Sequence, residues 1–272
     1  MRARRTDPAA RLLDWPATSR RVRSWPAQRL RGAYEYVVFY CLIALFGLGS
    51  LFWSLLARIL HFVLPRALAE PLGQFMIMLG FRGFVTAMRL SGIIKCELDE
   101  LDALACAAPL VIAPNHPTLL DAVLVISRLP HVVCAAKAGI LDNVFLGGGA
   151  RLAGFVRNDS PAGLVREAVR QVKCGRHFLI FPEGTRSSLR PVGEFKGGFA
   201  LIAKHASVPV QPIFIETNSP FLGKGWPLFR KPDFPLVYRA RLGRRIAAEG
   251  DVHNVVIRLR GYYEQEFGTG ES

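Results

Sequence analysis

The chain has 272 residues, of which 51% are hydrophobic, and a formal net charge of +14 at pH 7. It is long enough to bury a sizeable core, and its excess of basic residues favours a polyanionic partner, either anionic lipid or nucleic acid. Its five cysteines are scattered, with no CxxC pair and no metal-ligand spacing, which argues against a disulfide framework and a structural zinc site.

The first third of the sequence combines a basic arm with a long apolar segment. Residues 1–33 carry nine arginines and two aspartates, a composition that favours contact with anionic lipid headgroups. Residues 36–57 contain no charge, and about 20 apolar residues suffice for a helix to cross a bilayer. We therefore predict a helical membrane anchor over residues 34–90. Basic residues on both flanks favour a monotopic or re-entrant anchor with a hinge at residues 47–50, and a single span is the alternative.

From Ser91 onwards, short apolar segments alternate with amphipathic ones. This alternation predicts an α/β domain over residues 91–272, with a mixed, mainly parallel sheet flanked by helices. Strands are expected at residues 92–98, 110–113, 131–136, 177–181 and 210–215, and helices at 117–128, 161–174, 195–206 and after Asp251. Four arginines predict an edge strand at 237–246, and residues 147–149 predict a flexible glycine loop. Residues 218–235, rich in proline and aromatics, are expected to form an irregular loop that packs on the core or enters the membrane interface.

A histidine and an aspartate follow the expected strand 110–113, in the sequence NHPTLLD of residues 115–121. Because proline favours the first turn of a helix, His116 is expected at a strand-to-helix turn. The Asp121 carboxylate can then reach one ring nitrogen and stabilise the imidazolium, while the other nitrogen accepts a proton from a hydroxyl. The helix N-terminus offers N–H groups to an oxyanion. The alternative is a capping aspartate beside a surface histidine.

A second polar turn follows the expected strand 177–181. In the sequence PEGTRS, residues 182–187, Glu183 and Arg186 flank the flexible Gly184. The planar guanidinium of an arginine suits a phosphate, and a carboxylate accepts a hydrogen bond from a hydroxyl. An ordinary turn with a local salt bridge is the alternative interpretation.

Together, these two motifs resemble those of the glycerolipid acyltransferases, a family that includes the 1-acylglycerol-3-phosphate acyltransferases. NHPTLLD is similar to the family's NHxxxxD block, FPEGTRS (residues 181–187) to its FPEGTRS block, and VPVQPI (residues 208–213) to its VPVxPI block. The resemblance extends over residues 90–267 or so. It implies that His116 is the general base, that Asp121 is its partner, and that the EGTR turn binds the glycerol and phosphate of the acceptor.

Further candidate residues surround these blocks. The family's second block ends with a basic residue, and Arg157 is its nearest equivalent in this sequence. Lys137 closes the expected strand 131–136 and Lys196 follows the EGTR turn, so each is expected near a substrate phosphate, with a solvated lysine as the alternative. The complete prediction is His116 and Asp121 as catalytic residues, with Asn115, Lys137, Arg157, Glu183, Gly184, Thr185, Arg186 and Lys196 as substrate-binding residues.

The resemblance implies a membrane-bound enzyme that moves a fatty acyl group from acyl-CoA or acyl carrier protein to the free hydroxyl of a lysophospholipid. The acceptor it favours is 1-acylglycerol-3-phosphate, giving phosphatidic acid, and another lysolipid is the alternative. Because such thioesters are made inside the cell, the catalytic domain is expected on the cytoplasmic face of the inner membrane. No metal or cofactor is implied, and no nucleic-acid motif is present. A non-catalytic lipid-binding protein is the alternative from another class.

Overall fold

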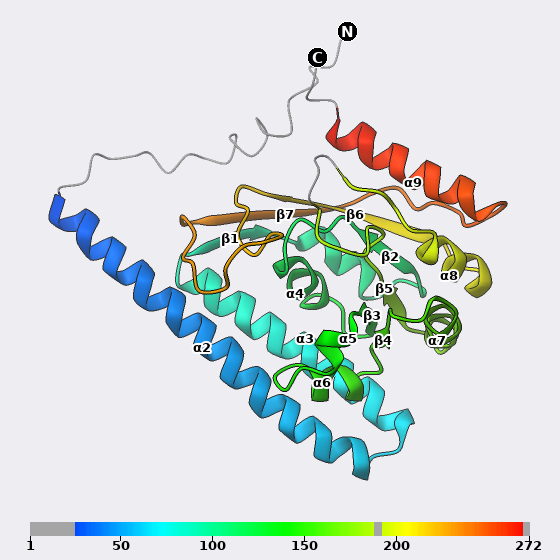
Figure 1. Cartoon of the computed structure of the whole chain (residues 1–272), viewed down its shortest axis with the longest axis horizontal. Coiled ribbons are helices and arrows are strands. Elements are labelled where there is room, and N and C mark those ends of the chain that lie inside the picture. The colour runs from blue at the N-terminus through cyan, green and yellow to red at the C-terminus, as the bar shows by residue number, and fades with distance from the viewer. Residues whose placement is uncertain (1–24, 188–191, 269–272) are drawn as a thin grey trace, which may run out of the picture.

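A seven-stranded sheet forms the centre of the structure, a computed structural model that describes residues 25–187 and 192–268 (Figure 1). The elements, in chain order, are α2 (Trp25–Val63), α3 (Arg66–Leu90), β1 (Ile94–Glu97), the 3₁₀ helix η1 (Asp99–Leu104), β2 (Val111–Pro114), α4 (Leu120–Ile126), β3 (Val132–Ala136), α5 (Ala138–Leu141), α6 (Gly147–Leu152), β4 (Val156–Arg157), α7 (Pro161–Lys173), β5 (His177–Leu179), α8 (Gly198–Ala206), β6 (Val210–Thr217), β7 (Leu236–Leu242) and α9 (Val252–Phe267).

The strands lie in the order β1-β7-β6-β2-β5-β3-β4. Every neighbouring pair is parallel except β6 and β7, which are antiparallel. Helices cover the sheet on both faces, and α2 and α3 run together along one side of the molecule (Figure 1). The prediction of an α/β fold with a mixed, mainly parallel sheet is therefore confirmed.

The core lies on both faces of the sheet. Ile112 of β2 packs with buried side chains of α3 and α4, whereas its neighbours Val111 and Ala113 pack with α7, α8 and α9. Successive side chains of a strand point to opposite faces, so a central strand that is covered on both sides is apolar throughout. The residues after Pro114 consequently lie at the carboxyl edge of the parallel strands, where α/β sheets place their sites.

Strand β7 departs from its prediction, because it is not an edge strand. It lies between β1 and β6, and its arginines are accommodated by carboxylates on those two neighbours. The Arg239 side chain pairs with Glu97 of β1, and Arg241 pairs with Glu216 of β6 at 3.2 Å. Charge in a strand indicates an edge only where no opposite charge stands on the adjacent strands.

Helix α2 is continuous from Trp25 to Val63, and therefore starts inside the predicted basic arm; residues 1–24 lie outside the described residues. The predicted hinge at residues 47–50 is wrong, since the helix runs straight through this segment. The chain turns instead at Pro65, which precedes the first residue of α3. Within the described chain, one segment, Gln28–Val63, is long and apolar enough to cross a membrane. In an apolar stretch of 18 residues within this segment, only 17% is buried inside the protein.

Helix α6 replaces the predicted flexible glycine loop. Its glycines allow the backbone to approach α2 closely: the Gly148 N–H donates to Ser54 Oγ at 2.9 Å, and a Cβ atom at Gly148 would overlap the Ser54 carbonyl oxygen. A Cβ atom at Gly149 would lie 2.6 Å from the indole nitrogen of Trp53. The packing of α6 on α2 therefore requires these glycines. Through this contact, the middle of α2 lies against the sheet domain.

Replacing Gly148 by alanine should separate α2 from α6. Overpacking of this kind costs about 1–3 kcal/mol, so we expect a lower thermal unfolding midpoint for the detergent-solubilised protein. Gly32→Ala is the matched control, since no atom lies within 4 Å of a Cβ atom at Gly32 of α2. That change should raise stability by about 0.5–1 kcal/mol because glycine weakens a helix. Equal midpoints for the two variants would contradict the packing role of Gly148.

Candidate active site

His116 and Asp121 form a hydrogen-bonded dyad at the carboxyl end of β2. His116 Nδ1 lies 2.9 Å from Asp121 Oδ2, the Asp121 side chain is fully buried, and 14% of the His116 side chain is exposed. Helix α4 begins only at Leu120, so His116 lies in the turn that precedes it and its ring can turn back towards the helix. The pair meets because the turn, rather than a regular helix, separates the two residues.

The Asp121 carboxylate also organises this turn. Its Oδ2 accepts a hydrogen bond from the Thr118 N–H at 2.7 Å, and its Oδ1 accepts one from Thr118 Oγ1 at 2.7 Å. The same carboxylate therefore holds the turn before α4 and pairs with the histidine. Burial raises the pKa of Asp121, while the hydrogen bonds from His116 and Thr118 act in the opposite direction.

Tyr238 connects the dyad to β7, which β6 separates from β2 in the sheet. Its hydroxyl lies 3.1 Å from Thr118 Oγ1, and since Thr118 donates its own proton to Asp121, the tyrosine is the donor. Tyr238 is fully buried on β7, where burial and the nearby Asp121 charge raise its pKa. It consequently remains a neutral donor. Sequence analysis missed both Thr118 and Tyr238, because the link exists only once β7 is placed in the sheet.

Asn115 connects the turn to β6 rather than to the cavity. Its Nδ2 donates to the Ile215 carbonyl at 2.9 Å, and its Oδ1 accepts from the Ile215 N–H at 2.7 Å. The side chain thus continues the β2–β6 ladder beyond Pro114, and only 4% of the residue is exposed. A substrate-binding role for Asn115 stays a prediction, and this geometry gives it a structural one.

Glu183 and Ser187 hold the main chain of His116 from the second motif. Glu183 Oε1 accepts from the His116 N–H at 3.2 Å and from Ser187 Oγ at 2.7 Å, and the Ser187 N–H donates to the His116 carbonyl at 2.7 Å. Glu183 Oε2 accepts from the Gly193 N–H at 3.1 Å. The Phe181 ring stacks on the imidazole, with 3.8 Å between centroids and 21° between planes. The second motif therefore fixes both the backbone and the ring of the histidine.

The remaining residues of the EGTR turn face the cavity. Gly184 has a left-handed backbone, φ 65°, which favours glycine, and the Lys196 side chain lies over it. Thr185 is exposed, and Arg186 Nη1 donates to the carbonyls of Leu222 at 2.9 Å and Gly223 at 2.6 Å. Arg186 thus ties the turn to the loop between β6 and β7 while still lining the cavity.

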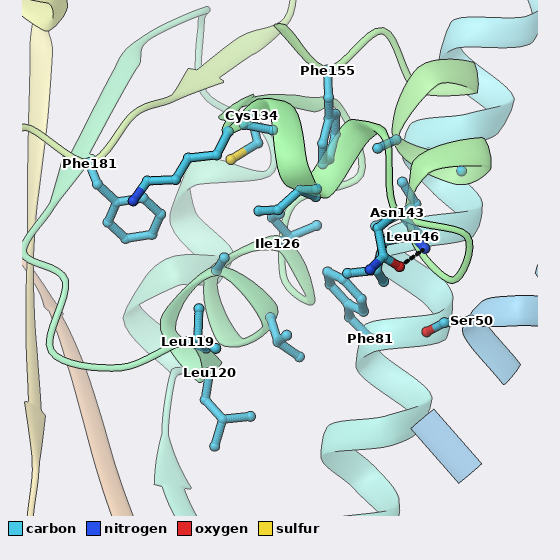
Figure 2. A pocket seen from close by; sticks show the side chains of 18 of the residues that line it. Ser50, Phe81, Leu119, Leu120, Ile126, Cys134, Asn143, Leu146, Phe155 and Phe181 are labelled. Carbon is cyan, nitrogen blue, oxygen red and sulfur yellow. Dashed lines mark hydrogen bonds between the residues drawn. The ribbon is translucent and has the colours of Figure 1, made fainter. Parts of the chain in front are cut away.

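A cavity of about 2190 Å³ opens at His116. Its walls are mainly apolar and come from α2, α3, α4 and residues 134–169; Figure 2 shows Phe81, Leu120, Ile126, Leu146 and Phe155 around it. Small-molecule sites usually measure about 300–1,000 Å³, so this space is large enough for a long apolar chain. Four basic residues also line it, namely Lys137, Arg166, Arg186 and Lys196, and no acidic residue of the described chain does.

Arg157 lies apart from this group. It pairs with Asp142 at 3.2 Å and with Asp159 at 2.8 Å, close to the surface, and it is not among the cavity-lining residues. Hydrogen bonds to Asp159 raise its pKa further. A contact between Arg157 and substrate therefore stays a prediction. Arg166 of α7, which sequence analysis did not select, lines the cavity instead.

Comparison with known proteins agrees with this geometry. Residues 95–216 match the family model described as Acyltransferase. The chain is 29% identical over 198 residues to the chloroplast 1-acyl-sn-glycerol-3-phosphate acyltransferase LPAT1 of Arabidopsis thaliana, and the match covers 69% of this chain and 51% of that protein. It is 24% identical to the 1-acyl-sn-glycerol-3-phosphate acyltransferase of Pseudomonas aeruginosa, over 84% of this chain and 86% of that one. Residues 95–216 therefore form an Acyltransferase domain similar to those of the 1-acyl-sn-glycerol-3-phosphate acyltransferases.

The fold of the chain also has a counterpart in a solved structure. The crystal structure of the 1-acyl-sn-glycerophosphate (LPA) acyltransferase PlsC from Thermotoga maritima superposes with a TM-score of 0.62 at 21% identity, covering 89% of this chain and 95% of that one. The chain spans about half the length, or less, of the chloroplast acyltransferases that it matches. The dyad and the EGTR turn fall inside the matched acyltransferase region, whereas Tyr238 lies beyond it.

Removing the Thr118 hydroxyl should alter how the His116–Asp121 dyad responds to pH. In Thr118→Val the Asp121 carboxylate loses a donor, so its pKa rises and the dyad becomes protonated at higher pH. We expect the acidic limb of the kcat/KM profile to move to higher pH, with a smaller move in the same direction for Tyr238→Phe. Tyr263→Phe is the control, because this buried hydroxyl donates to the Ala113 carbonyl and not to the dyad. If the acidic limbs of all variants coincided with that of the wild type, the hydrogen bonds from Tyr238 through Thr118 to Asp121 would have no effect on the dyad.

Replacing Glu183 by glutamine should impair turnover more than acceptor binding. The amide nitrogen of glutamine cannot accept a hydrogen bond, so either the His116 N–H or the Gly193 N–H loses its partner and the imidazole moves. Small displacements of this kind can cost a factor of about 100, and we expect kcat to fall by about 10- to 100-fold with little change in KM for the acceptor. Ser187→Ala, which removes one contact of the same cluster, should give an intermediate loss. A rise in KM at constant kcat would instead indicate that Glu183 contacts the acceptor.

Proposed function

We propose that this protein is a membrane-bound O-acyltransferase that transfers a fatty acyl group from a thioester to the free hydroxyl of 1-acylglycerol-3-phosphate, giving phosphatidic acid. One observation carries the proposal: the His116–Asp121 dyad opens into a large cavity with apolar walls and basic side chains. An apolar wall suits acyl chains, and the basic residues suit the phosphate of the acceptor. Relatives over most of the chain are named for this reaction.

In the proposed mechanism, His116 Nε2 accepts the proton of the acceptor hydroxyl as its oxygen attacks the thioester carbonyl. Nδ1 is held by Asp121, which fixes the tautomer and stabilises the imidazolium. The tetrahedral intermediate collapses by breaking the carbon–sulfur bond, and His116 returns the proton to the departing thiolate. The ester product and the free thiol are released, and the dyad regains its starting protonation.

The backbone N–H groups before α4 do not support the expected oxyanion site. Those of His116 and Thr118 donate to the carboxylates of Glu183 and Asp121, and that of Leu119 donates to the Leu222 carbonyl. We therefore assign the electrostatic stabilisation of the oxyanion to the cationic side chains that line the cavity, among which Lys196 lies beside the EGTR turn. Cations placed where negative charge develops act in the same way as an oxyanion hole.

A covalent route through the cavity cysteine has no support. Cys134 lines the cavity, but burial raises the pKa of its thiol to about 12. The nucleophilic form of cysteine is the thiolate, which is therefore scarce at neutral pH. Direct attack by the acceptor hydroxyl, with His116 as base, is the simpler reaction.

The membrane association that we propose rests on α2. Its apolar surface is largely exposed, whereas Phe39, Leu42 and Ala57 are buried against the rest of the protein. A helix that packs sideways on the sheet domain at several points along its length favours a monotopic anchor over a single span. The cytoplasmic face of the inner membrane is the location that gives access to acyl-CoA or acyl carrier protein, and both donors remain compatible with the proposal.

Replacing His116 by alanine tests the function directly. General-base catalysis contributes a factor of about 10² to 10⁴, so membranes containing His116→Ala should lose nearly all transfer of labelled palmitate from either thioester to 1-acylglycerol-3-phosphate. His253→Ala is the matched control, since this histidine is exposed on α9. Near-normal turnover in His116→Ala would refute the mechanism. An inactive wild type would refute 1-acylglycerol-3-phosphate as the acceptor. Binding of lipid without any transfer would favour the non-catalytic alternative.

A further inference from the structure

The loop between β6 and β7, residues 218–235, is bonded at its base to both catalytic motifs. The Leu222 carbonyl accepts from the Leu119 N–H of the first motif at 3.1 Å and from Arg186 Nη1 of the second at 2.9 Å. The Gly223 carbonyl accepts from the same arginine nitrogen at 2.6 Å. The position of this loop is therefore coupled by hydrogen bonds to the two turns that hold the dyad and line the cavity.

The sides of the loop pack on the first half of α2. The Phe39 ring lies 5.9 Å from Phe221 and 6.2 Å from Phe234, between centroids. Lys231 Nζ pairs with Glu35 at 3.1 Å, in a partly buried salt bridge. In Figure 1 the loop lies next to α2 at the edge of the sheet, far from α9. The loop and the apolar helix thus form one surface.

The tip of the loop is apolar and exposed. Leu228 is 52% exposed and Phe229 is 64% exposed, and Tyr40 of α2 donates to the Phe229 carbonyl at 3.3 Å. Both tip residues are among those that line the cavity, and because each is more than half exposed they lie at its rim, which is the mouth of the cavity. Two basic residues flank the tip, the exposed Lys224 and Arg230. Exposed apolar side chains that continue a larger apolar surface mark an interaction site.

We propose that Leu228 and Phe229 insert into the interface of an anionic bilayer beside α2, and so hold the mouth of the cavity against the lipid surface. The exposed apolar face of α2 continues into the tip, and the basic residues around it complement anionic headgroups. This inference rests on the proposed function, in which the acceptor is a membrane lipid. Phe221 and Phe234 pack on α2, so the loop divides into an anchored stem and a lipid-facing tip.

A comparison of two acceptors tests the inference. The double variant Leu228→Ser/Phe229→Ser should lose at least about tenfold in rate with acceptor embedded in anionic vesicles, because burying one such side chain is worth more than the 1.4 kcal/mol of a tenfold effect. With a short-chain, water-soluble acceptor the loss should stay below about threefold. Ile257→Ser on α9, which removes a side chain that is 54% exposed, should alter neither rate. Equal losses with the two acceptors would overturn the inference.

A second measurement does not depend on activity. Phe229→Trp and Ile257→Trp each add one indole, and vesicles containing brominated lipids quench indoles that enter the bilayer. We expect the emission added at residue 229 to be quenched and that added at residue 257 to persist. Absence of quenching at both positions would overturn the inference even in an active enzyme. Quenching at residue 229 in a protein without transferase activity would support the loop and refute the proposed function.

Discussion

The site depends on one buried carboxylate. Asp121 has no exposed surface, and a charge in such a position is tolerated only when hydrogen bonds replace the water that it has lost. Those bonds come from the Thr118 backbone and hydroxyl and from His116. Because the same three groups determine the shape of the turn, the chain cannot satisfy the carboxylate without bringing the imidazole to it. The geometry of His116 is a consequence of folding.

A second carboxylate holds the histidine from the opposite side. Glu183 accepts from the His116 N–H, and the neighbouring Ser187 N–H donates to its carbonyl. The two sequence motifs are far apart in the chain, yet β2 and β5 are adjacent and parallel, so both motifs emerge at the same edge. The EGTR turn therefore has two functions in one segment. Glu183 points inwards and holds the main chain of His116, while Arg186 and the backbone around Gly184 face the cavity.

Much of the fold and part of the site could be predicted from the sequence. The apolar strands and the helix that starts at Pro161, capped by Ser160, follow from local patterns, and the two motifs lie where strand ends place them. What could not be predicted depends on contacts between distant segments. The arginines of β7 are tolerated because Glu97 and Glu216 lie on its neighbours. Gly148 and Gly149 lie in a helix that packs so closely on α2 that Cβ atoms would overlap it. Periodicity and composition carry no information about such partners.

The same limit explains why Thr118 and Tyr238 were missed, and it bears on how the N-terminal helices relate to the region around the dyad. Phe39 and Leu42 of α2 share a single buried cluster with Ile112 of β2. The cavity that opens at His116 is lined by α2 and α3 as well as by the sheet domain. A soluble sheet domain without these helices would lose one wall of its cavity and expose part of its core. The apolar N-terminal helices are therefore part of the site, because they form one wall of the cavity that leads to the dyad.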